Sequence, residues 1–549
     1  MPLTLLVLSL SFAAPRDELI RFVPDDAGFC LIANDLAKHV SALTDSPFAA
    51  SLAKSALGRS LSASSEWQNL CKLEAKLTRN LGMGWTELTD VVPGAAVGYA
   101  YRPDPAGRAD RDEGLYLIRA KNARNLADFV NKINAAQKKS GELRDLISRE
   151  HNGVSYVRRV EAKQSIYYLL RGSILVFSAQ EEMLRRAIDR EASLGVGELG
   201  AFGKHLGRLE ESAAIHVMVN PRVFDTGFAA IAGKDAFVKG MNDYWKAVDA
   251  IDVSLSFESD VRLALHILGD PKRLPPAGRR FMTKTTQPSA VWGYIPETAL
   301  IAIAGRLDLS LTYGLLGDFL TPDKRMAMEK ELECQFGALV GKNVVRELLP
   351  TLGPDWGLWV VAPPTESREL LPRVVLAVRV NSSKTLAEDE AILDTVHLLI
   401  QMTVSSHNRN NPAHTVRIHP HVVAKTRVRA VEGLPAGLLP AYGLRNGFLL
   451  LTTHVDEVGR FELSKSTSRT MALMQLSLTS WRDYIVRHRT ALSEWLATRE
   501  GVKAETVALR LDSLKELIGL FTRVDLSYDS GSGRSTFILS LKPAERLRK

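Results

Sequence analysis

Five short patterns return in the same order about half a chain length further on, and this repetition constrains the fold more than any other feature. The offsets run from 260 residues (Leu117 to Ala377) to 274 residues (Leu170 to Leu444). The five pairs are Val23–Ala27 and Ile295–Ala299, Val91–Tyr101 and Leu352–Val361, Leu117–Leu126 and Ala377–Leu386, Leu170–Phe177 and Leu444–Leu451, and Ile251–Ser254 and Val524–Ser527. We therefore expect two homologous domains in tandem.

The 549 residues are enough for more than one core, since an average domain uses about 150. We expect a signal peptide over residues 1–13, a first copy over 14–285 and a second copy over 286–549. The stretch from Gly269 to Gly278 is rich in Pro and Gly, which is typical of a linker between domains.

Each copy mixes strand and helix periodicities, which predicts an α+β fold with mainly antiparallel sheets packed with helices. Hairpins are expected at Gly172 and at Asn446–Gly447, because Asn-Gly is the strongest short hairpin signal. The expected strands are Leu115–Ile118, Ile174–Phe177 and Ile251–Phe257, and the expected helices are Leu126–Ile133, Met183–Ile188, Leu473–Leu478 and Val507–Leu520.

The N-terminal sequence has the features of an export signal. The apolar run Leu3–Leu10 is followed by small residues up to Ala14, which favours cleavage after Ala13 and a periplasmic or secreted protein. Because no Lys or Arg precedes the run, the alternative is a buried leading strand. No apolar run reaches the ~20 residues of a membrane span, so we expect no transmembrane segment in the mature chain.

The three cysteines, Cys30, Cys71 and Cys334, are too few for a disulfide framework. Cys30 lies in an apolar run, and its expected role is that of a small buried hydrophobe. A bridge between Cys30 and Cys71 remains an alternative.

The sequence contains no complete catalytic signature among those that we compared. Gly337–Asn343 imitates a phosphate-binding loop but is one residue short and ends in Asn where a hydroxyl is needed. Ser51–Lys54 has the spacing of the penicillin-binding serine motif without its companion motifs. We therefore expect no cofactor and favour a non-catalytic protein.

One stretch, from Thr395 to Val431, contains no Asp or Glu but carries five Lys or Arg and five of the twelve His. If residues 419–431 form one extended strand, the odd positions share a face. We expect these side chains to bind an anion: His419, His421, Lys425, Arg427 and Arg429. The alternatives are an ordinary solvated face and a metal site at His419 and His421, which lacks a nearby carboxylate or Cys.

A nucleic-acid partner is not expected. The net charge of +8 is only mildly basic, and no aromatic residue lies between Thr395 and Val431 to stack with bases.

The export signal with Val23–Ala27, the Val92–Gly94 turn and the Leu170–Gly172 hairpin resemble a family of uncharacterised exported bacterial proteins of planctomycete type. That family is built on a duplicated α+β domain of unknown function. The resemblance implies export and the fold, and it implies no activity or catalytic residue.

The favoured hypothesis is an exported binding protein for a hydrophobic or anionic ligand or an envelope partner. The alternatives are a hydrolase-type enzyme with an unrecognised active site and a structural or assembly component of the cell envelope. An enzyme would have a concave pocket with convergent acids or His of shifted pKa, whereas a binding protein would expose an apolar groove or a basic ladder.

Overall fold

The computed structural model describes residues 14–545 and Leu547, except for residues 82–94, 105–107, 196–197, 210–212, 233–234, 338–340, 342, 368, 382–385, 436, 464–471 and 532. The expected signal peptide over residues 1–13 lies outside the described residues, as does the turn at Val92–Gly94.

The chain separates into two compact units. Unit 1 contains Met1–Thr226, Asp249–Leu268 and Arg546–Lys549, and unit 2 contains Gly227–Val248 and Gly269–Glu545. The segment Gly227–Val248 belongs to unit 2 although it precedes the last strands of unit 1 in sequence.

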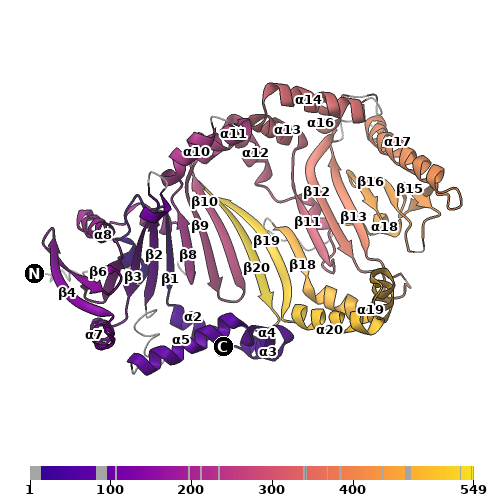
Figure 1. The fold of residues 1–549 in the computed structure, drawn as a ribbon. Helices are drawn as coiled ribbons and strands as arrows, with labels where there is room; N and C mark the ends of the chain where they lie inside the picture. The colour runs from indigo at the N-terminus through magenta and orange to yellow at the C-terminus, as the bar shows by residue number, and fades with distance from the viewer. Residues whose placement is uncertain are drawn as a thin grey trace, which may run out of the picture. The chain divides into compact units, whose positions relative to one another are not determined.

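Unit 1 is built around ten described strands (Figure 1). Their pairing gives the order β4, β5, β6, β7, β3, β2, β1, β8, β9, β10, and the pairs from β4 to β9 are antiparallel. The strands are β1 (Phe29–Asn34), β2 (Ala96–Arg102), β3 (Glu113–Arg119), β4 (Leu143–His151), β5 (Val154–Glu161), β6 (Ser165–Arg171), β7 (Ile174–Ser178), β8 (Ile215–Val219), β9 (Val248–Phe257) and β10 (Val261–Gly269).

Helices cover both faces of this sheet, because alternate residues of its strands are apolar on each side. Leu117 and Val176 pack with α1, α8 and α9, whereas Ile118 and Leu175 pack with α7. The helices of unit 1 are α1 (Pro15–Ile20), α2 (Leu36–Thr44), α3 (Pro47–Lys54), α4 (Ala56–Ser62), α5 (Ser65–Leu81), η1 (Ala109–Arg111), α7 (Ala123–Ser140), α8 (Glu181–Ser193), α9 (Ala201–Leu206) and η2 (Pro221–Phe224).

Unit 2 is also built around ten described strands, all in antiparallel pairs. Their order is β14, β15, β16, β17, β13, β12, β11, β18, β19, β20. The strands are β11 (Ile301–Arg306), β12 (Leu352–Val361), β13 (Arg373–Val380), β14 (Arg417–Val423), β15 (Thr426–Glu432), β16 (Ala441–Arg445), β17 (Phe448–Thr452), β18 (Ala472–Ser477), β19 (Phe521–Gly531) and β20 (Arg534–Pro543).

The helices of unit 2 likewise pack on both faces of its sheet. Leu450 packs with η4 and α18, whereas its neighbour Leu449 packs with α17. The helices are α10 (Asp225–Ala232, most of it in unit 2), α11 (Ala236–Trp245), η3 (Pro271–Arg273), α12 (Pro276–Thr285), η4 (Ala290–Tyr294), α13 (Leu309–Leu316), η5 (Gly317–Phe319), α14 (Pro322–Leu332), η6 (Glu333–Gly337), η7 (Val344–Leu348), α16 (Leu349–Thr351), α17 (Leu386–Asn410), α18 (Asp456–Arg460), α19 (Leu478–Glu500) and α20 (Ala504–Gly519).

The two units have the same strand order. Each strand of unit 2 occupies the place of the strand of unit 1 whose label is ten lower, so that β13 lies between β12 and β17 as β3 lies between β2 and β7. The repeated patterns of the sequence fall on equivalent elements, for example Leu170–Phe177 on β6 and β7 and Leu444–Leu451 on β16 and β17.

The α+β class with mainly antiparallel sheets is confirmed, as are the hairpins at Gly172 and Asn446–Gly447. The expected helix over Leu473–Leu478 is wrong, because Ala472–Ser477 forms β18 and pairs with β11 and β19. A short apolar run fits either period, and pairing with strands on both sides outweighs its weak helical preference.

Cys30 is buried in the core of unit 1 and Cys71 is exposed, and all three cysteines are free thiols. Burial raises the pKa of the Cys30 thiol to about 12, so it behaves as the small hydrophobe expected from the sequence. No bridge joins Cys30 to Cys71.

Candidate anion-binding site

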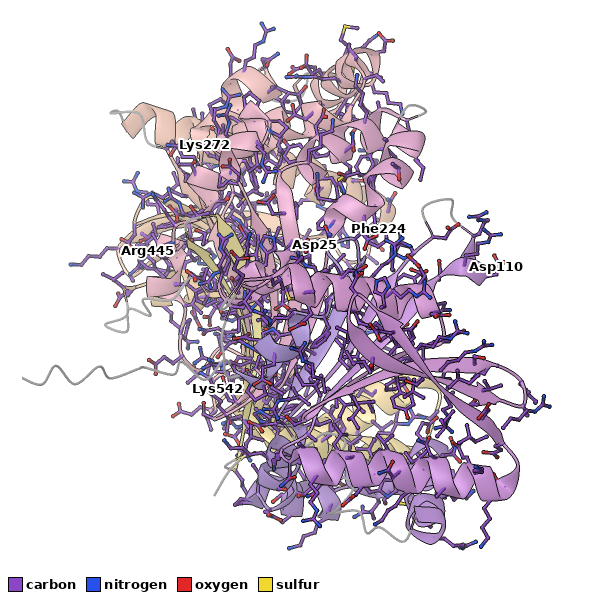
Figure 2. All side chains as sticks on the ribbon, turned by 90° about the vertical axis from the view of Figure 1, so that its left-hand side faces the viewer. Asp25, Asp110, Phe224, Lys272, Arg445 and Lys542 are labelled. Carbon is purple, nitrogen blue, oxygen red and sulfur yellow. The ribbon has the colours of Figure 1, made fainter. Side chains whose placement is uncertain are left out.

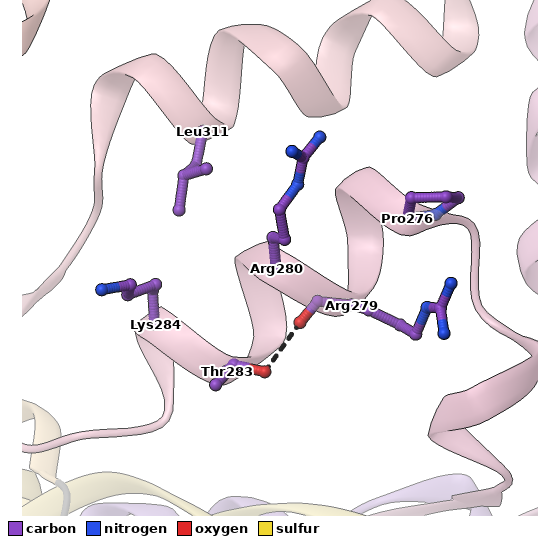
Figure 3. A pocket seen from close by; sticks show the side chains of 6 residues that line it. All are labelled: Pro276, Arg279, Arg280, Thr283, Lys284 and Leu311. Atoms are coloured by element: carbon purple, nitrogen blue, oxygen red, sulfur yellow. Dashed lines mark hydrogen bonds between the residues drawn. The ribbon is translucent and has the colours of Figure 1, made fainter.

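A pocket of about 500 Å³ in unit 2 gathers positively charged side chains along one face of α12 (Figure 3). We call it the α12 pocket. Its lining consists of Pro276, Arg279, Arg280, Thr283 and Lys284 of α12 and Leu311 of α13. The three cationic side chains are exposed, and none of the described residues that line the pocket is acidic.

The sequence of α12 places these cations together. Pro276 is the first helical residue, where its fixed backbone angle suits a helix start. Arg279 and Thr283, like Arg280 and Lys284, are four residues apart and therefore lie on neighbouring turns of one helix face. The Thr283 hydroxyl donates to the Arg279 carbonyl oxygen at 2.9 Å, so the hydroxyl hydrogen is already engaged (Figure 3).

The opposite side of α12 packs closely on α11. Gly278 is buried, and a Cβ atom added there would lie 2.4 Å from the ring of Tyr244. The Tyr244 hydroxyl donates to the Asp318 carboxylate at 2.6 Å, and its ring stacks on Phe319 with the centroids 5.2 Å apart. Burial, followed by the hydrogen bond to Asp318, raises the pKa of Tyr244, so the phenol stays neutral as a support for α12.

The cations of the α12 pocket form no ion pair with the acidic residues that the structure describes. Among the residues that the structure describes, no carboxylate forms an ion pair with Arg279, Arg280 or Lys284. Unpaired guanidinium and ammonium groups on one helix face give a locally positive potential, and guanidinium groups suit the geometry of carboxylate, phosphate and sulfate.

The five residues predicted from the sequence lie on the β14–β15 hairpin, and the prediction that they share one face is wrong. Residues 417–423 pair with residues 426–432, so that His421 lies opposite Val428 and His419 opposite Ala430. Directly paired residues point to the same side of a sheet. The even positions of β15 therefore share the face of the two imidazoles, and Arg427 and Arg429 lie on the other face.

The cause of this difference is a two-residue turn. Ala424 and Lys425 both have positive φ, 47° and 65°, as the tight hairpin turn of this kind requires. The turn reverses the chain within the segment that was expected to be one strand, and it places Lys425 in the turn instead of on a strand face.

Carboxylates partner three of the predicted residues, and the longest of these distances, 3.9 Å, joins His419 Nε2 to a carboxylate oxygen of Glu432. His421 Nε2 lies 2.8 Å from a carboxylate oxygen of Glu432, and Arg429 donates to Asp394 at 3.0 Å. Asp394 and Glu432 are the residues immediately outside the acid-free stretch 395–431. Arg429 also contacts the hydroxyl of the buried Tyr442 beside His397, so it joins α17 to the sheet.

The α12 cations were not singled out from the sequence, although a signal was present. Residues 271–296 contain no Asp or Glu and carry five cations: Lys272, Arg273, Arg279, Arg280 and Lys284. The Pro and Gly at the start of this stretch favoured a linker, but η3 and α12 occupy it, and Lys272 of η3 is labelled in Figure 2.

A second pocket, of about 380 Å³, lies in unit 1 at Asp25, which is labelled in Figure 2. It is lined by Asp25, Ala201, Phe202, His205, Val219, Asn220, Arg222, Asp249 and Ala250. Burial lowers the pKa of His205, and the charge of Asp249 opposes this shift. Asp25 pairs with Arg190 at 2.9 Å and Arg222 pairs with Asp225 at 3.1 Å, so these charges are balanced locally.

Within the described part of the chain, no group of three or more His, Cys, Asp or Glu side chains is arranged to hold a metal ion. No described helix combines the length and the apolar character that crossing a membrane needs.

Comparison with known proteins gives no family. No family model matches the chain, and no curated protein matches it. Crystal forms I, III and IV of TP0453 match with TM-scores of 0.24, 0.24 and 0.23 and identities of 9%, 10% and 8%. These matches cover 46%, 45% and 45% of this chain and 78%, 78% and 79% of TP0453. The fold and the α12 pocket define an α+β protein with an exposed cationic pocket, and its function is argued from these side chains.

Proposed function

We propose that the chain is a non-catalytic binding protein that holds an anionic ligand in the α12 pocket. The observation that carries this proposal is that Arg279, Arg280 and Lys284 line one pocket and that none of them has an acidic partner among the described residues. The ligand class comprises molecules that bear several sulfate, phosphate or carboxylate groups.

The side chains of the α12 pocket are better suited to binding an anion than to catalysing a reaction. Arginine side chains stay charged under all physiological conditions and are poor proton donors or acceptors for catalysis. The described residues that line the pocket include no His, Cys, Asp or Glu that could act as a general base. An array of fixed positive charges instead attracts and orients an anion.

The pocket of unit 1 gives the strongest support for the alternative that the protein is a hydrolase. His205 beside Asp249 is a half-buried imidazole of shifted pKa, as the alternative requires. The described residues that line that pocket, however, include no Ser, Thr, Cys, Lys or Tyr, and the carboxylate of Asp25 is paired with Arg190. The binding function is therefore the one that we propose.

We propose that the protein is exported to the periplasm or secreted, and that its two copies arose by duplication. The apolar run before Ala14 supports export, and the shared strand order of the two units supports duplication. Mass spectrometry of the protein purified from its own host tests export, which predicts a mature chain that begins at Ala14. An intact N-terminal segment would contradict export.

The binding proposal is tested by titration with dextran sulfate at low salt, comparing two variants that each lose three positive charges. The pocket triple variant is Arg279→Ser/Arg280→Ser/Lys284→Ser. The hairpin triple variant is Arg417→Ser/Lys425→Ser/Arg427→Ser, whose three side chains are all exposed. Both variants change the net charge by the same amount. A difference in affinity between them therefore shows that the position of the removed charges matters.

We expect the pocket triple variant to bind at least about tenfold more weakly than the unaltered protein, and the hairpin triple variant to lose less than about threefold. Circular dichroism of both variants checks that the fold is kept. Equal losses in the two variants would refute the proposal, because binding would then follow the overall charge.

A further inference from the structure

One helix of each unit carries a polar side chain at the same position of its inner face. On α7 of unit 1 this residue is Asn134, and on α17 of unit 2 it is His397. Three apolar residues that pack on the sheet precede it with the same spacing: Phe129, Val130 and Ile133 on α7, and Ile392, Leu393 and Val396 on α17. The two units therefore place an amide and an imidazole at equivalent positions.

Each of these side chains contacts the hydroxyl of a tyrosine on the sheet. Tyr168 of β6 and Tyr442 of β16 are equivalent, because each lies two residues before the start of the same repeated pattern. Asn134 Nδ2 donates to the Tyr168 hydroxyl at 3.4 Å, and His397 Nδ1 lies 2.5 Å from the Tyr442 hydroxyl. One contact contains a group that titrates near neutral pH, and the other does not.

An arginine from the neighbouring strand joins each contact, in a different way. In unit 1, Arg159 donates to Asn134 Oδ1 at 3.0 Å, so the amide bridges the guanidinium and the tyrosine. In unit 2, Arg429 lies directly opposite Tyr442 and contacts its hydroxyl. Because a guanidinium can only donate, the Tyr442 oxygen accepts from Arg429 and its hydrogen is left for His397.

The neutral and the protonated imidazole differ in what they can offer to Tyr442. His397 Nδ1 accepts the hydroxyl hydrogen only when it carries no proton of its own. A protonated imidazole donates from both nitrogens, so the Tyr442 oxygen would face two cationic donors and its hydrogen would lose its acceptor. Tyr442 is buried, which makes an unsatisfied hydroxyl costly.

We propose that this contact is sensitive to pH: it holds α17 on the sheet of unit 2 while His397 is neutral, and it loosens α17 when the imidazole is protonated (Figure 1). The Asn134 amide does not titrate, so α7 of unit 1 stays attached at either pH. Asn408 holds the C-terminal end of α17 through two hydrogen bonds with the Val416 backbone, at 2.9 and 2.7 Å. These amide bonds do not titrate either, so the loosening is confined to the part of α17 that carries His397.

The charges around His397 favour the neutral form at neutral pH. Burial and, after it, the positive charge of Arg429 lower the pKa of His397, and the charge of Asp394 opposes this shift. Arg427 is exposed on the same face of β15 as Arg429, and burial raises the pKa of Tyr442, so the phenol stays neutral. A His whose pKa is lower in the folded than in the unfolded chain stabilises the fold above about pH 6.5, and this stabilisation is lost as the pH falls towards the folded pKa.

The test measures hydrogen–deuterium exchange of the complete chain at pH 7.5 and pH 5.5. Each rate is divided by the rate of an unstructured peptide at the same pH, which gives a protection factor. The protection of residues 391–405 reports on α17, and that of residues 123–140 of α7 is an internal control.

Two variants remove the proposed contact and one leaves it in place. His397→Asn introduces the residue that unit 1 has at this position, and Tyr442→Phe removes only the hydroxyl. The matched control is His407→Gln on the same helix, whose imidazole Nε2 lies 3.2 Å from the His414 carbonyl oxygen and outside the contact. Circular dichroism checks that each variant folds.

We expect the protection of residues 391–405 in the unaltered protein to fall at least about threefold from pH 7.5 to pH 5.5, since one pKa unit corresponds to tenfold. The protection of α7 should change by less than about twofold. The pH effect on α17 should fall below about twofold in His397→Asn, should be less than half as large in Tyr442→Phe, and should be unchanged in His407→Gln.

Equal protection of α17 at the two pH values in the unaltered protein would overturn the proposal. An undiminished pH effect in His397→Asn and Tyr442→Phe would overturn it as well, and Tyr442→Phe decides alone if His397→Asn does not fold. Loss of the pH effect in His407→Gln would assign the titration to the other imidazole of α17 and would also contradict the proposal.

Discussion

The α12 pocket and the β14–β15 hairpin are both rich in positive charge in sequence, yet they differ in how that charge is used. In the α12 pocket, Arg279, Arg280 and Lys284 share one helix face, and no described carboxylate pairs with them. In the hairpin, by contrast, Arg429 and His421 have carboxylate partners, and a turn divides the cations between two faces.

The difference shows that an acid-free stretch of sequence does not by itself make a positive surface. The acids that pair with Arg429 and His421, Asp394 and Glu432, lie one residue beyond either end of the stretch and are brought back by α17 and by strand pairing. Because Arg417, Lys425 and Arg427 of the hairpin also have no carboxylate partner among the described residues, we place the anion site where unpaired cations line a pocket.

The largest effect should come from disturbing the packing that holds α12. Gly278→Ala adds a Cβ atom 2.4 Å from the Tyr244 ring, which Phe319 and Asp318 hold in place. We expect the free energy of unfolding to fall by about 1–3 kcal/mol and dextran sulfate affinity to fall several-fold. Urea denaturation and the binding titration measure both.

The matched control is Gly314→Ala in the neighbouring α13, where an added Cβ atom meets no other atom within 4 Å. Alanine favours a helix over glycine, so this change should stabilise the protein by up to about 1 kcal/mol. Loss of stability in Gly314→Ala equal to that in Gly278→Ala would mean that the contact with Tyr244 does not hold α12.

Within the hairpin, Arg427 and Arg429 should contribute differently to the free energy of unfolding. Arg429 bonds Asp394 and contacts Tyr442, so Arg429→Ala should cost about 1 kcal/mol. Arg427 is exposed, and Arg427→Ala should change stability by less than about 0.5 kcal/mol. Thermal unfolding followed by circular dichroism measures this difference, and a larger cost for Arg427→Ala would contradict the structural role of Arg429.

The pH dependence of dextran sulfate binding further distinguishes the α12 pocket from the β14–β15 hairpin. Arginine and lysine side chains keep their charge between pH 5.5 and 7.5, whereas imidazole groups gain positive charge as the pH falls through about 6.5. Binding at the α12 pocket should therefore change by less than about twofold over this range. A several-fold increase in dextran sulfate affinity at the lower pH would show instead that histidine side chains outside the α12 pocket take part in binding.

The smallest effect is expected at Thr283, the polar and uncharged residue of the pocket. Its hydroxyl hydrogen is engaged with the Arg279 carbonyl, so Thr283→Ala should alter dextran sulfate affinity by less than about twofold. Thr283→Val is a second variant, which keeps the shape of the side chain and removes the hydroxyl. A tenfold loss in both variants would show that this hydroxyl binds the anion directly.

Much of the fold could be predicted from the sequence, because local patterns decide it. The Asn446–Gly447 turn gives its hairpin directly, since both residues adopt the positive φ that such a turn needs. The alternation along Ile251–Phe257 likewise predicts β9. The helix predicted over Leu473–Leu478 is wrong because local patterns do not decide the structure there. That run forms a strand through its pairing with β11 and β19.

The candidate site could not be predicted in the same way. The hairpin turn at Ala424–Lys425 has no Gly, Asn or Asp to signal it, so the segment reads as one strand with all cations on one face. At α12, the prolines at 275 and 276 suggest a linker, whereas Pro276 in fact starts a helix. Whether a cation is paired depends on residues distant in sequence, as with Arg429 and Asp394.

The most direct test of the central claim is hydrogen–deuterium exchange of the complete chain with and without dextran sulfate at low salt. The account predicts that the anion slows exchange in peptides that cover residues 276–285 and leaves those that cover residues 417–432 unchanged. Slower exchange over residues 417–432 with no change over residues 276–285 would contradict it.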